Sequence, residues 1–319
     1  MTVVDDGDLT DAVADDDGVT RVRLTSDPDP DLLVGVGALL DRAAAADDAP
    51  PLNEAALLAL RHPDRGDVRH VVAVAAGAPV GYAQLAADGT GQLVVDPRLR
   101  RRGVGRLLME SLLDTARRHD QQLRVWALGD SPAARALAAR TGLVPARTLL
   151  IMQRPLADLP APVVPEGISI GTFRVGVDEQ AWLTVNARAF AHHPEQGSID
   201  AEDLAERTGE RWFDPAGFFL ARATSDAESP VLGFHWTKEH GNGLGEVYVL
   251  GVDPDAQGRG LAKALLLTGL AHLRDAGDEV VELYVESDQP GPVGLYRAYG
   301  FVDASRDVMY AGPDAGPRP

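Results

Sequence analysis

Two glycine- and arginine-rich stretches are the residues best suited to chemistry in this 319-residue chain. One reads V-D-P-D-A-Q-G-R-G-L-A over Val252–Ala262, and the other reads V-D-P-R-L-R-R-R-G-V-G over Val95–Gly105. Each follows a predicted strand and opens a predicted helix, where the first backbone N–H groups lack partners and the helix dipole is positive. Glycines there let the backbone approach a ligand closely. The pattern predicts that each stretch holds the diphosphate of a nucleotide.

Three kinds of phosphate-binding loop combine a strand, glycines and a helix. A P-loop requires Gly-Lys-Ser/Thr, which neither stretch contains. A dinucleotide fingerprint requires G-x-G-x-x-G with an acidic residue about 20 positions later, and the spacing here differs. The remaining pattern, Q/R-x-x-G-x-G/A, resembles the acetyl-CoA loop of the GNAT acetyltransferases. The alternative is a glycine-bearing turn that binds no ligand.

The elements that must position these loops occur twice in the same order. In each half, helices precede two strands, a third strand leads into the loop and its helix, and one more strand and helix follow. The first set is predicted at Asp31–Ala46, Glu54–Arg61, His70–Ala75, Val80–Ala86, Gly91–Val95, Val104–Arg118, Leu123–Ala127 and Pro132–Thr141. The second set is predicted at Asp178–Ala191, Ala201–Arg211, Gly217–Ala223, Val231–Thr237, Gly245–Val252, Leu261–Ala276, Val280–Val285 and Pro292–Tyr299. Each half is therefore predicted to be an α/β unit with a mixed sheet.

Matching residues at a nearly constant separation indicate an internal duplication. Val95-Asp96-Pro97 recurs 157 positions later as Val252-Asp253-Pro254. Further matches are separated by 158 positions, from Asp130, Pro132, Leu137 and Gly142 to Asp288, Pro290, Leu295 and Gly300. This period is far too long for a solenoid, so we expect two tandem domains.

Segments of distinct composition surround the two expected domains. Residues 1–18 are rich in Asp and poor in bulky apolar side chains, which predicts a disordered acidic tail. Residues 155–167 are rich in proline, which cannot donate to a strand ladder, so they are predicted to be an extended linker. The N-terminal domain is predicted at residues 19–154 and the C-terminal domain at 168–312.

Composition narrows the classes of function and partner. The formal net charge is −18, so we expect no nucleic-acid partner. The absence of cysteine excludes disulfides, a thiol nucleophile and thiolate metal sites. No stretch reaches the roughly 20 apolar residues of a membrane span, and the N-terminus does not look like a signal peptide. We expect a cytoplasmic monomer without a membrane or metal; the adjacent His192 and His193 would point apart.

Longer strings in the second half carry a closer resemblance. They are FAHHPEQG (190–197), RWFDP (211–215), GFHWTK (233–238), LGEVYVLGVDP (244–254) and LYVESD (283–288). These strings resemble the mycothiol synthases, tandem GNAT enzymes that acetylate the cysteinyl amine of a glucosaminyl-inositol precursor. The resemblance extends from about Ala49 to Tyr310 and is densest after Ala187. It departs from the family at Gln289, where the family usually has Asn.

The resemblance implies a set of site residues. It makes Glu246 the general base, acting through water, and Tyr296 the general acid. The implied substrate contacts are Glu54, Glu195, Lys238, Glu246 and Tyr284. The residues implied to surround acetyl-CoA are Leu250, Gly251, Val252, Gln257, Gly258, Arg259, Gly260, Leu261, Ala262, Lys263, Gln289, Pro290, Gly291, Pro292, Val293 and Gly294. A second acetyl-CoA in the first half is implied at Leu93, Val94, Val95, Arg101, Arg102, Gly103, Val104, Gly105 and Arg106.

The position of Glu246 in its strand agrees with the implied chemistry. Even spacing puts four residues on one strand face unless a bulge intervenes: Glu246, Tyr248, Leu250 and Val252. This arrangement predicts a carboxylate near the acetyl end of the cofactor, where a weak base can deprotonate an amine. The alternatives are an exposed strand acid at Glu246 and a core aromatic at Tyr296.

The duplication separates the two halves by their proton-transfer groups. At the observed separations, Glu246 corresponds to Gly89 and Tyr296 corresponds to Ala138. We therefore expect the first half to bind acetyl-CoA without turning it over. Two other functions remain open: acetylation of another amine, such as an aminoglycoside, a polyamine or a protein N-terminus, and non-catalytic sensing of acyl-CoA.

Overall fold

The computed structural model describes residues 10–15, 18–25, 29–47, 49–61, 68–223 and 229–312. The chain divides into two units. Residues 1–149 and 306–318 belong to the N-terminal unit, and residues 150–305 belong to the C-terminal unit. Both units contain a mixed sheet with helices, as the sequence predicts.

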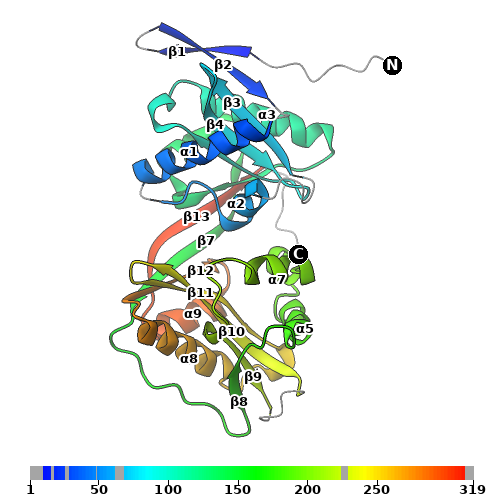
Figure 1. The fold of residues 1–319 in the computed structure, drawn as a ribbon, viewed down its shortest axis with the longest axis vertical. Helices are drawn as coiled ribbons and strands as arrows, with labels where there is room; N and C mark the ends of the chain where they lie inside the picture. The colour runs from blue at the N-terminus through cyan, green and yellow to red at the C-terminus, as the bar shows by residue number, and fades with distance from the viewer. Residues whose placement is uncertain are drawn as a thin grey trace. The chain divides into compact units, whose positions relative to one another are not determined.

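The N-terminal unit has the sheet order β1-β2-β3-β4-β5-β6-β13-β7 (Figure 1). Its strands are β1 (Thr10–Asp15), β2 (Gly18–Thr25), β3 (Arg69–Ala75), β4 (Ala78–Leu85), β5 (Thr90–Val95), β6 (Arg124–Ala127) and parts of β7 (Val144–Pro155) and β13 (Val302–Ala311). Its helices are α1 (Pro30–Asp47), α2 (Glu54–Arg61), α3 (Val104–Arg118) and α4 (Pro132–Arg140). Strands β5 and β6 pair in parallel, whereas β3 and β5 each pair antiparallel with β4.

The C-terminal unit repeats this arrangement with the sheet order β7-β12-β11-β10-β9-β8. Its remaining strands are β8 (Ser169–Thr172), β9 (Phe218–Arg222), β10 (Val231–Gly241), β11 (Leu244–Val252) and β12 (Val280–Glu286). Its helices are α5 (Glu179–Ala189), α6 (Pro194–Gly197), α7 (Ala201–Thr208), α8 (Leu261–Ala276) and α9 (Pro290–Ala298). Strand β11 pairs antiparallel with β10 and parallel with β12.

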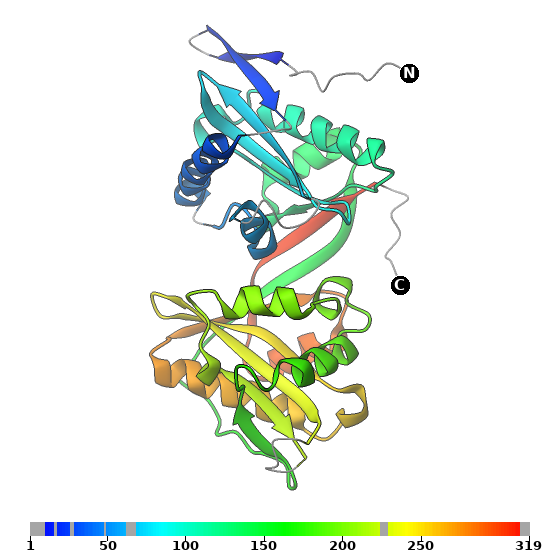
Figure 2. The ribbon, with the colours of Figure 1, turned by 45° about the vertical axis from the view of Figure 1, so that its right-hand side comes forward.

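Helices lie on both faces of each sheet (Figure 2). Apolar side chains of the strands pack against these helices. In the C-terminal unit, α8 and α9 cover one face and α5 and α7 contribute to the core on the other. Trp182 of α5 is fully buried there, with its ring edge-on to Phe218, Phe234 and Trp236 at centroid distances of 5.5–5.8 Å. Among the described helices, none combines the length and apolar character that crossing a bilayer requires.

The helices that follow the two glycine-rich loops have the predicted bounds. Gly103 precedes α3 with φ +95°, and Gly260 precedes α8 with φ +80°. Residues with a side chain rarely adopt this left-handed conformation, so each glycine fixes the first residue of its helix. Elsewhere the bounds shift by a few residues; β10 continues to Gly241 and α7 ends at Thr208.

The division between the units differs from the predicted one because the chain exchanges strands. Strand β7 crosses from the N-terminal to the C-terminal unit at Leu149/Leu150, and β13 crosses back at Ser305/Arg306. The proline-rich stretch 155–167 is not the boundary: it lies within the C-terminal unit, where Leu156 is fully buried. Pairing between strands far apart in sequence leaves no local signal, so composition marked the wrong place.

Hydrogen bonds secure the returning strand in the N-terminal unit. Met309 of β13 lies opposite Trp126 of β6. The Tyr310 hydroxyl donates to Asp130 Oδ1 at 2.6 Å, and Arg306 donates to Asp130 Oδ2 at 3.2 Å. The C-terminal strand is therefore part of the N-terminal unit's sheet, and the units are not separate stretches of sequence.

The predicted acidic tail contains a strand. Residues 10–15 form β1, which pairs antiparallel with β2. The expectation of disorder is therefore wrong for these six residues, while residues 1–9 and 16–17 lie outside the described part of the chain. The alternation in T-D-A-V-A-D is too short and acidic to be recognised as a strand from composition.

Candidate active site

The loop between β11 and α8 is open to a ligand. Residues 257–260 are exposed, and a Cβ added to Gly258 would meet no atom within 4 Å. Gly260, the N-cap residue of α8, has no side chain to cap the helix, and the first N–H groups of a helix lie at the positive end of its dipole. The exposed backbone, the helix start and the neighbouring Arg259 fit an anionic diphosphate.

Strands β11 and β12 separate before they reach this loop. Their pairing runs from Leu244↔Val280 to Val247↔Leu283. Beyond this point β11 continues to Val252 and β12 to Glu286, without further pairing between them among the described residues. Backbone groups of β11 are thus available to an extended ligand that carries amides, because backbone donors and acceptors require partners.

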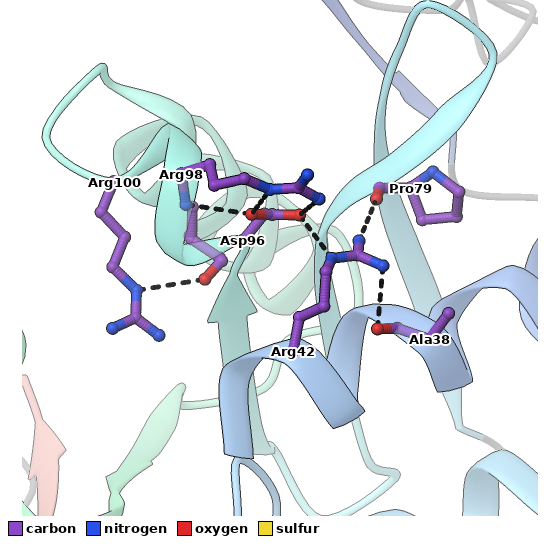
Figure 3. Close-up of polar contacts among 7 residues, drawn as sticks. Ala38, Arg42, Pro79, Asp96, Arg98 and Arg100 are labelled. Carbon is purple, nitrogen blue, oxygen red and sulfur yellow. Dashed lines mark hydrogen bonds and ion pairs between the residues drawn. The ribbon is translucent and has the colours of Figure 1, made fainter. Parts of the chain in front are cut away.

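An arginine from the first helix of each unit binds the loop's aspartate. In the C-terminal unit Arg188 of α5 donates to both oxygens of Asp253, at 2.7 and 2.9 Å, and to Asp255 at 2.7 Å. In the N-terminal unit Arg42 of α1 donates to Asp96 at 2.9 Å (Figure 3). The duplicated contact fixes the turn from which each loop departs.

Arginines of the N-terminal loop have internal partners. Arg98 donates to both oxygens of Asp96 (Figure 3). Arg100 donates to the carbonyl of Val95 and to Asp47. Burial alone would raise the pKa of Asp96, but the hydrogen bonds from Arg98 and Arg42 lower it to about 2. The carboxylate is therefore ionised at neutral pH and keeps these guanidinium groups in place.

The other residues predicted to hold a cofactor in the N-terminal unit differ in their surroundings, and their role stays a prediction. Arg106 forms an ion pair with Glu110 at 2.9 Å, one turn along α3. Arg101 is exposed and has φ +65°. A Cβ added to Gly103 would meet no atom within 4 Å, so the space beside this glycine is open. Strands β5 and β6 pair only at Thr90↔Arg124 and Gly91↔Val125 among the described residues, so they separate as β11 and β12 do.

A β-bulge in β11 changes the predicted strand face. The register with β10 passes from Trp236↔Val249 to Thr237↔Val247, which leaves Tyr248 as the extra residue. Val247 packs in the cluster with α8, whereas Tyr248 and Val249 both pack in the cluster with α5. The strict alternation of side chains is therefore interrupted at Tyr248.

The predicted shared face of β11 is consequently only half right. Leu250 and Val252 pack with Leu261 and Leu265 of α8, not on the face of Tyr248. A shared face for the evenly spaced residues was predicted only for a strand without a bulge, and β11 contains one. Glu246 remains six residues before the loop on the same strand, and it is 7% exposed.

The bulge also changes which residue of the N-terminal unit corresponds to Glu246. Glu246 pairs with Glu282 as Thr90 pairs with Arg124. Strand β5 pairs with β4 without a register shift, so the separation between the halves falls by one upstream of the bulge. The counterpart of Glu246 is therefore Thr90, not Gly89. Neither residue has a carboxylate.

Glu246 has a close histidine partner that the sequence did not single out. His240 Nε2 lies 2.7 Å from Glu246 Oε2 and 4.0 Å from Glu282 Oε1. The hydrogen bond with Glu246 raises the pKa of His240, although burial opposes the shift. Glu282 in turn accepts from Gln153 at 3.0 Å. The two-residue spacing of Lys238 and His240 along β10 was a sequence signal that could have indicated this partner of Glu246.

Lys238 lies against two aromatic rings on this side of the C-terminal unit. Its Nζ is 4.4 Å from the ring centroid of Trp212 and 5.1 Å from that of Tyr248. Lys238 is directly opposite Glu246 in the β10–β11 register. Cation–π contacts of this kind fix an ammonium group without neutralising its charge. The sequence did not single out Trp212 or Tyr248 as partners.

The remaining residues predicted to contact the acceptor substrate lie on three different elements. Tyr284 lies two residues beyond Glu282 on β12 and is 44% exposed, so it shares the face of Glu282. Glu54 begins α2 in the N-terminal unit, and its role stays a prediction. Glu195 belongs to α6, and its side chain lies outside the described residues.

Tyr296 is on the buried side of α9. It is 8% exposed and packs edge-on to Phe301 at 5.6 Å. Burial raises the pKa of its phenol, so the group stays protonated at neutral pH and can donate a proton. Its counterpart at the same distance into α4 is Ala138, which has no such group.

The predicted cofactor contacts at the start of α9 form an exposed turn. Pro290 is at the first position of the helix after Gln289, which does not cap it through its side chain. Gly291, Pro292 and Gly294 are exposed, while Val293 packs in the core. The substitution of Gln for the family's Asn does not prevent the helix from starting here.

Among the residues that the structure describes, two groups of side chains have atoms close enough for a shared ion. Asp214, Glu239 and His272 form one, and His240, Glu246 and Glu282 form the other, each within 4.8 Å. In the second group His240 and Glu246 already satisfy one another by a hydrogen bond. The expectation that the protein uses no metal stays a prediction.

Known proteins resemble both units. The model of the "Acetyltransferase (GNAT) family" matches residues 39–143 and 182–301. A solved GCN5-related N-acetyltransferase from Sphaerobacter thermophilus has a TM-score of 0.65 at 27% identity, covering 91% of this chain and 95% of its own. A tandem GNAT protein from the clavulanic acid biosynthesis pathway has a TM-score of 0.69 at 24% identity, covering 93% and 100%, and supports the fold alone.

Curated relatives are similar over most of the sequence. The mycothiol acetyltransferase of Geodermatophilus obscurus is 52% identical over 297 residues, covering 88% of this chain and 94% of the relative. That of Kytococcus sedentarius is 49% identical over 283 residues, covering 87% and 93%. With two GNAT matches and this degree of identity, the chain belongs to the mycothiol acetyltransferases, a tandem-domain branch of the GNAT family.

Proposed function

We propose that the C-terminal unit transfers the acetyl group of acetyl-CoA to the cysteinyl amine of cysteinyl-glucosaminyl-inositol, the last step of mycothiol biosynthesis. The observation that carries the proposal is the placement of one buried carboxylate, Glu246, on the strand that opens toward the glycine loop. The proposed base is thereby on the strand that leads directly into the proposed cofactor loop. The family assignment supplies the identity of the acceptor.

The chain's own residues suit the two ends of the cofactor. The N–H groups at the start of α8 would hold the diphosphate, and the unpaired edge of β11 would hold the amide-bearing arm. Bound acetyl-CoA supplies a thioester that an uncharged amine can attack. Arg188 keeps the loop in place through Asp253.

Two groups move protons in the proposed reaction. An aminoacyl amine has a pKa of about 7–8, so a weak base is sufficient to obtain the uncharged form. Glu246 takes the proton through a water molecule, as the family implies. Tyr296, whose raised pKa keeps its phenol neutral, donates the hydroxyl proton to the departing thiolate. The resulting phenolate takes back the second proton, which the attacking nitrogen loses as the amide forms.

Other residues would recognise the acceptor. Lys238 and Tyr284 offer an ammonium group and a hydroxyl for the sugar and inositol hydroxyls. Glu54 and Glu195 stay proposed contacts of the same acceptor. The N-terminal unit would bind a second acetyl-CoA but would not turn it over, because Thr90 and Ala138 offer neither a carboxylate nor a phenol. We further propose that the protein works as a cytoplasmic monomer, without metal, nucleic acid or membrane.

The test is release of coenzyme A by the full chain. Acetyl-CoA is mixed with the cysteinyl precursor, an aminoglycoside, a polyamine or a peptide with a free N-terminus, and the free thiol is followed. We expect rapid release with the precursor and little with the other amines. Faster release with another amine would identify that amine as the acceptor in place of the cysteinyl precursor. Binding of acetyl-CoA without release in any mixture would favour a sensor.

A further inference from the structure

Strands β10 and β11 bring a histidine onto the carboxylate that we assign as base. The β10–β11 register shifts again between Glu239 and Gly241, so His240 is the extra residue of a second bulge. Bulges redirect side chains and occur next to active sites. Here His240 Nε2 reaches Glu246 Oε2 at 2.7 Å.

The direction of this hydrogen bond follows from the partners. An ionised carboxylate can only accept, so His240 Nε2–H is the donor and Glu246 Oε2 the acceptor. The hydrogen bond thereby fixes one oxygen of Glu246, and the proposed reaction needs only the other for the acceptor amine or its bridging water. The ring's Nδ1 remains free to titrate, and a third of the His240 side chain is exposed.

We propose that His240 is a positioning residue for acetyl transfer, which orients the Glu246 carboxylate through Nε2–H and weakens it as a base when Nδ1 becomes protonated. The proposal rests on the proposed function, because it needs Glu246 to act as the base. His240 itself need not touch either substrate.

The surrounding charges agree with such a role. Glu246 and Glu282 favour the imidazolium form of His240, while Lys238 opposes it. Asp278, on the turn before β12, also senses the charge of His240. Because the pKa of His240 is raised, the imidazolium form persists above the pH at which an ordinary histidine loses its proton. Activity limited by this group therefore falls as the pH decreases through that raised pKa.

Two substitutions separate orientation from titration. In His240→Gln the side-chain amide can replace Nε2–H as donor but cannot be protonated, whereas His240→Ala removes the donor. We expect kcat of His240→Ala to fall about 10–100-fold, because a displaced catalytic group loses much of its effect. We expect His240→Gln to stay within about 3-fold of the original at pH 8 and to lose less activity on acidification.

The experiment measures kcat and KM for the full-length variants and the unchanged chain between pH 5.5 and 9, with thermal unfolding as a check on folding. His119→Gln, an exposed histidine of the N-terminal unit, is the matched control and should change nothing. The inference is supported if His240→Gln retains activity, His240→Ala loses it, and only the original chain has the higher acid-side midpoint.

Three results would overturn the inference. They are an unchanged kcat in His240→Ala, equal losses in the Ala and Gln variants, and the same acid-side midpoint in His240→Gln as in the original chain, which would assign that midpoint to the acceptor amine. The unchanged chain separates this failure from that of the proposed function. If the unchanged chain releases no coenzyme A with the precursor, the proposed function is wrong. If it does release coenzyme A, only the proposed role of His240 is wrong.

Discussion

The two units have the same loop but different strands leading into it. In the C-terminal unit β11 contains a bulge at Tyr248 and a buried carboxylate at Glu246. In the N-terminal unit β5 is regular where it pairs with β4, and Thr90 occupies the equivalent place. The comparison teaches that the glycine loop and the carboxylate proposed as base are separable parts of this fold. One can persist after duplication without the other.

The two loops also differ in how their basic residues are used. In the N-terminal loop Arg98 and Arg100 bind carboxylates of their own unit. In the C-terminal unit the loop's aspartate is bound by Arg188 on α5, the counterpart of Arg42, from outside the loop. A count of arginines in a loop is therefore a poor measure of the charge available to a ligand.

The largest effect should come from the carboxylate that distinguishes the units. We expect Glu246→Gln to lower kcat by a factor on the order of 10²–10⁴, the usual contribution of a general base. Thr90→Val, at the equivalent place in β5, should leave kcat within about 2-fold. Steady-state release of coenzyme A measures both, and equal effects would remove the distinction between the units.

The phenol should come next. Tyr296→Phe keeps the ring packed on Phe301 but removes the proton donor, so we expect kcat to fall roughly 10²-fold. Tyr299→Phe, one turn later on the chain, is the control and should retain activity. Full activity in Tyr296→Phe would mean that Tyr296 is a core aromatic residue and not the proton donor.

The duplicated arginine contact should affect cofactor binding in one unit only. Arg188→Ala removes the donors to Asp253 and Asp255, and we expect KM for acetyl-CoA to rise about 3–10-fold because a charge-assisted contact contributes roughly 1 kcal/mol or more. Arg42→Ala makes the same change beside the N-terminal loop and should leave this KM unaltered. An equal rise in Arg42→Ala would imply that the N-terminal loop takes part in turnover.

The smallest effect on activity should come from the strand exchange. Asp130→Asn weakens the contacts to Tyr310 and Arg306, and we expect the free energy of unfolding to fall by about 1–2 kcal/mol with kcat nearly unchanged. Asp303→Asn breaks an exposed pair with Arg297 and should cost less than about 1 kcal/mol. Urea unfolding distinguishes the two, and a greater loss in Asp303→Asn would contradict the assigned importance of Asp130.

The stability supplied by Asp130 also has a defined pH dependence. Burial alone would raise its pKa, but hydrogen bonds from Tyr310 and Arg135 lower it below the ordinary value. A carboxyl group with a lowered pKa stabilises the fold above its unfolded pKa, and this stabilisation is lost as the pH falls through the folded value. Asp130→Asn should therefore reduce the acid sensitivity of unfolding.

Local rules predicted much of the molecule. The helices after the loops begin at the predicted residues because Gly103 and Gly260 adopt left-handed conformations that no side chain favours. The duplication was visible because aspartate, proline and glycine recur where turns require them. The candidate base was found through resemblance, and the structure adds that it is buried on the strand entering the loop.

What the sequence could not predict depends on contacts between distant residues. The bulge at Tyr248 leaves the alternating string E-V-Y-V-L-G-V unchanged in appearance, yet it moves Leu250 to the opposite face. The exchange of β7 and β13 depends on which strands pair, and the local amino-acid composition does not indicate that pairing. The partnership of His240 with Glu246 needs the register of a hairpin, which spacing alone does not set.

The most direct test combines the two substitutions in the C-terminal unit. The full-length Glu246→Gln/Tyr296→Phe variant should still bind two equivalents of acetyl-CoA by equilibrium dialysis, while release of coenzyme A with the cysteinyl precursor disappears. Release at the rate of the unchanged chain would contradict the assignment of catalysis to the C-terminal unit.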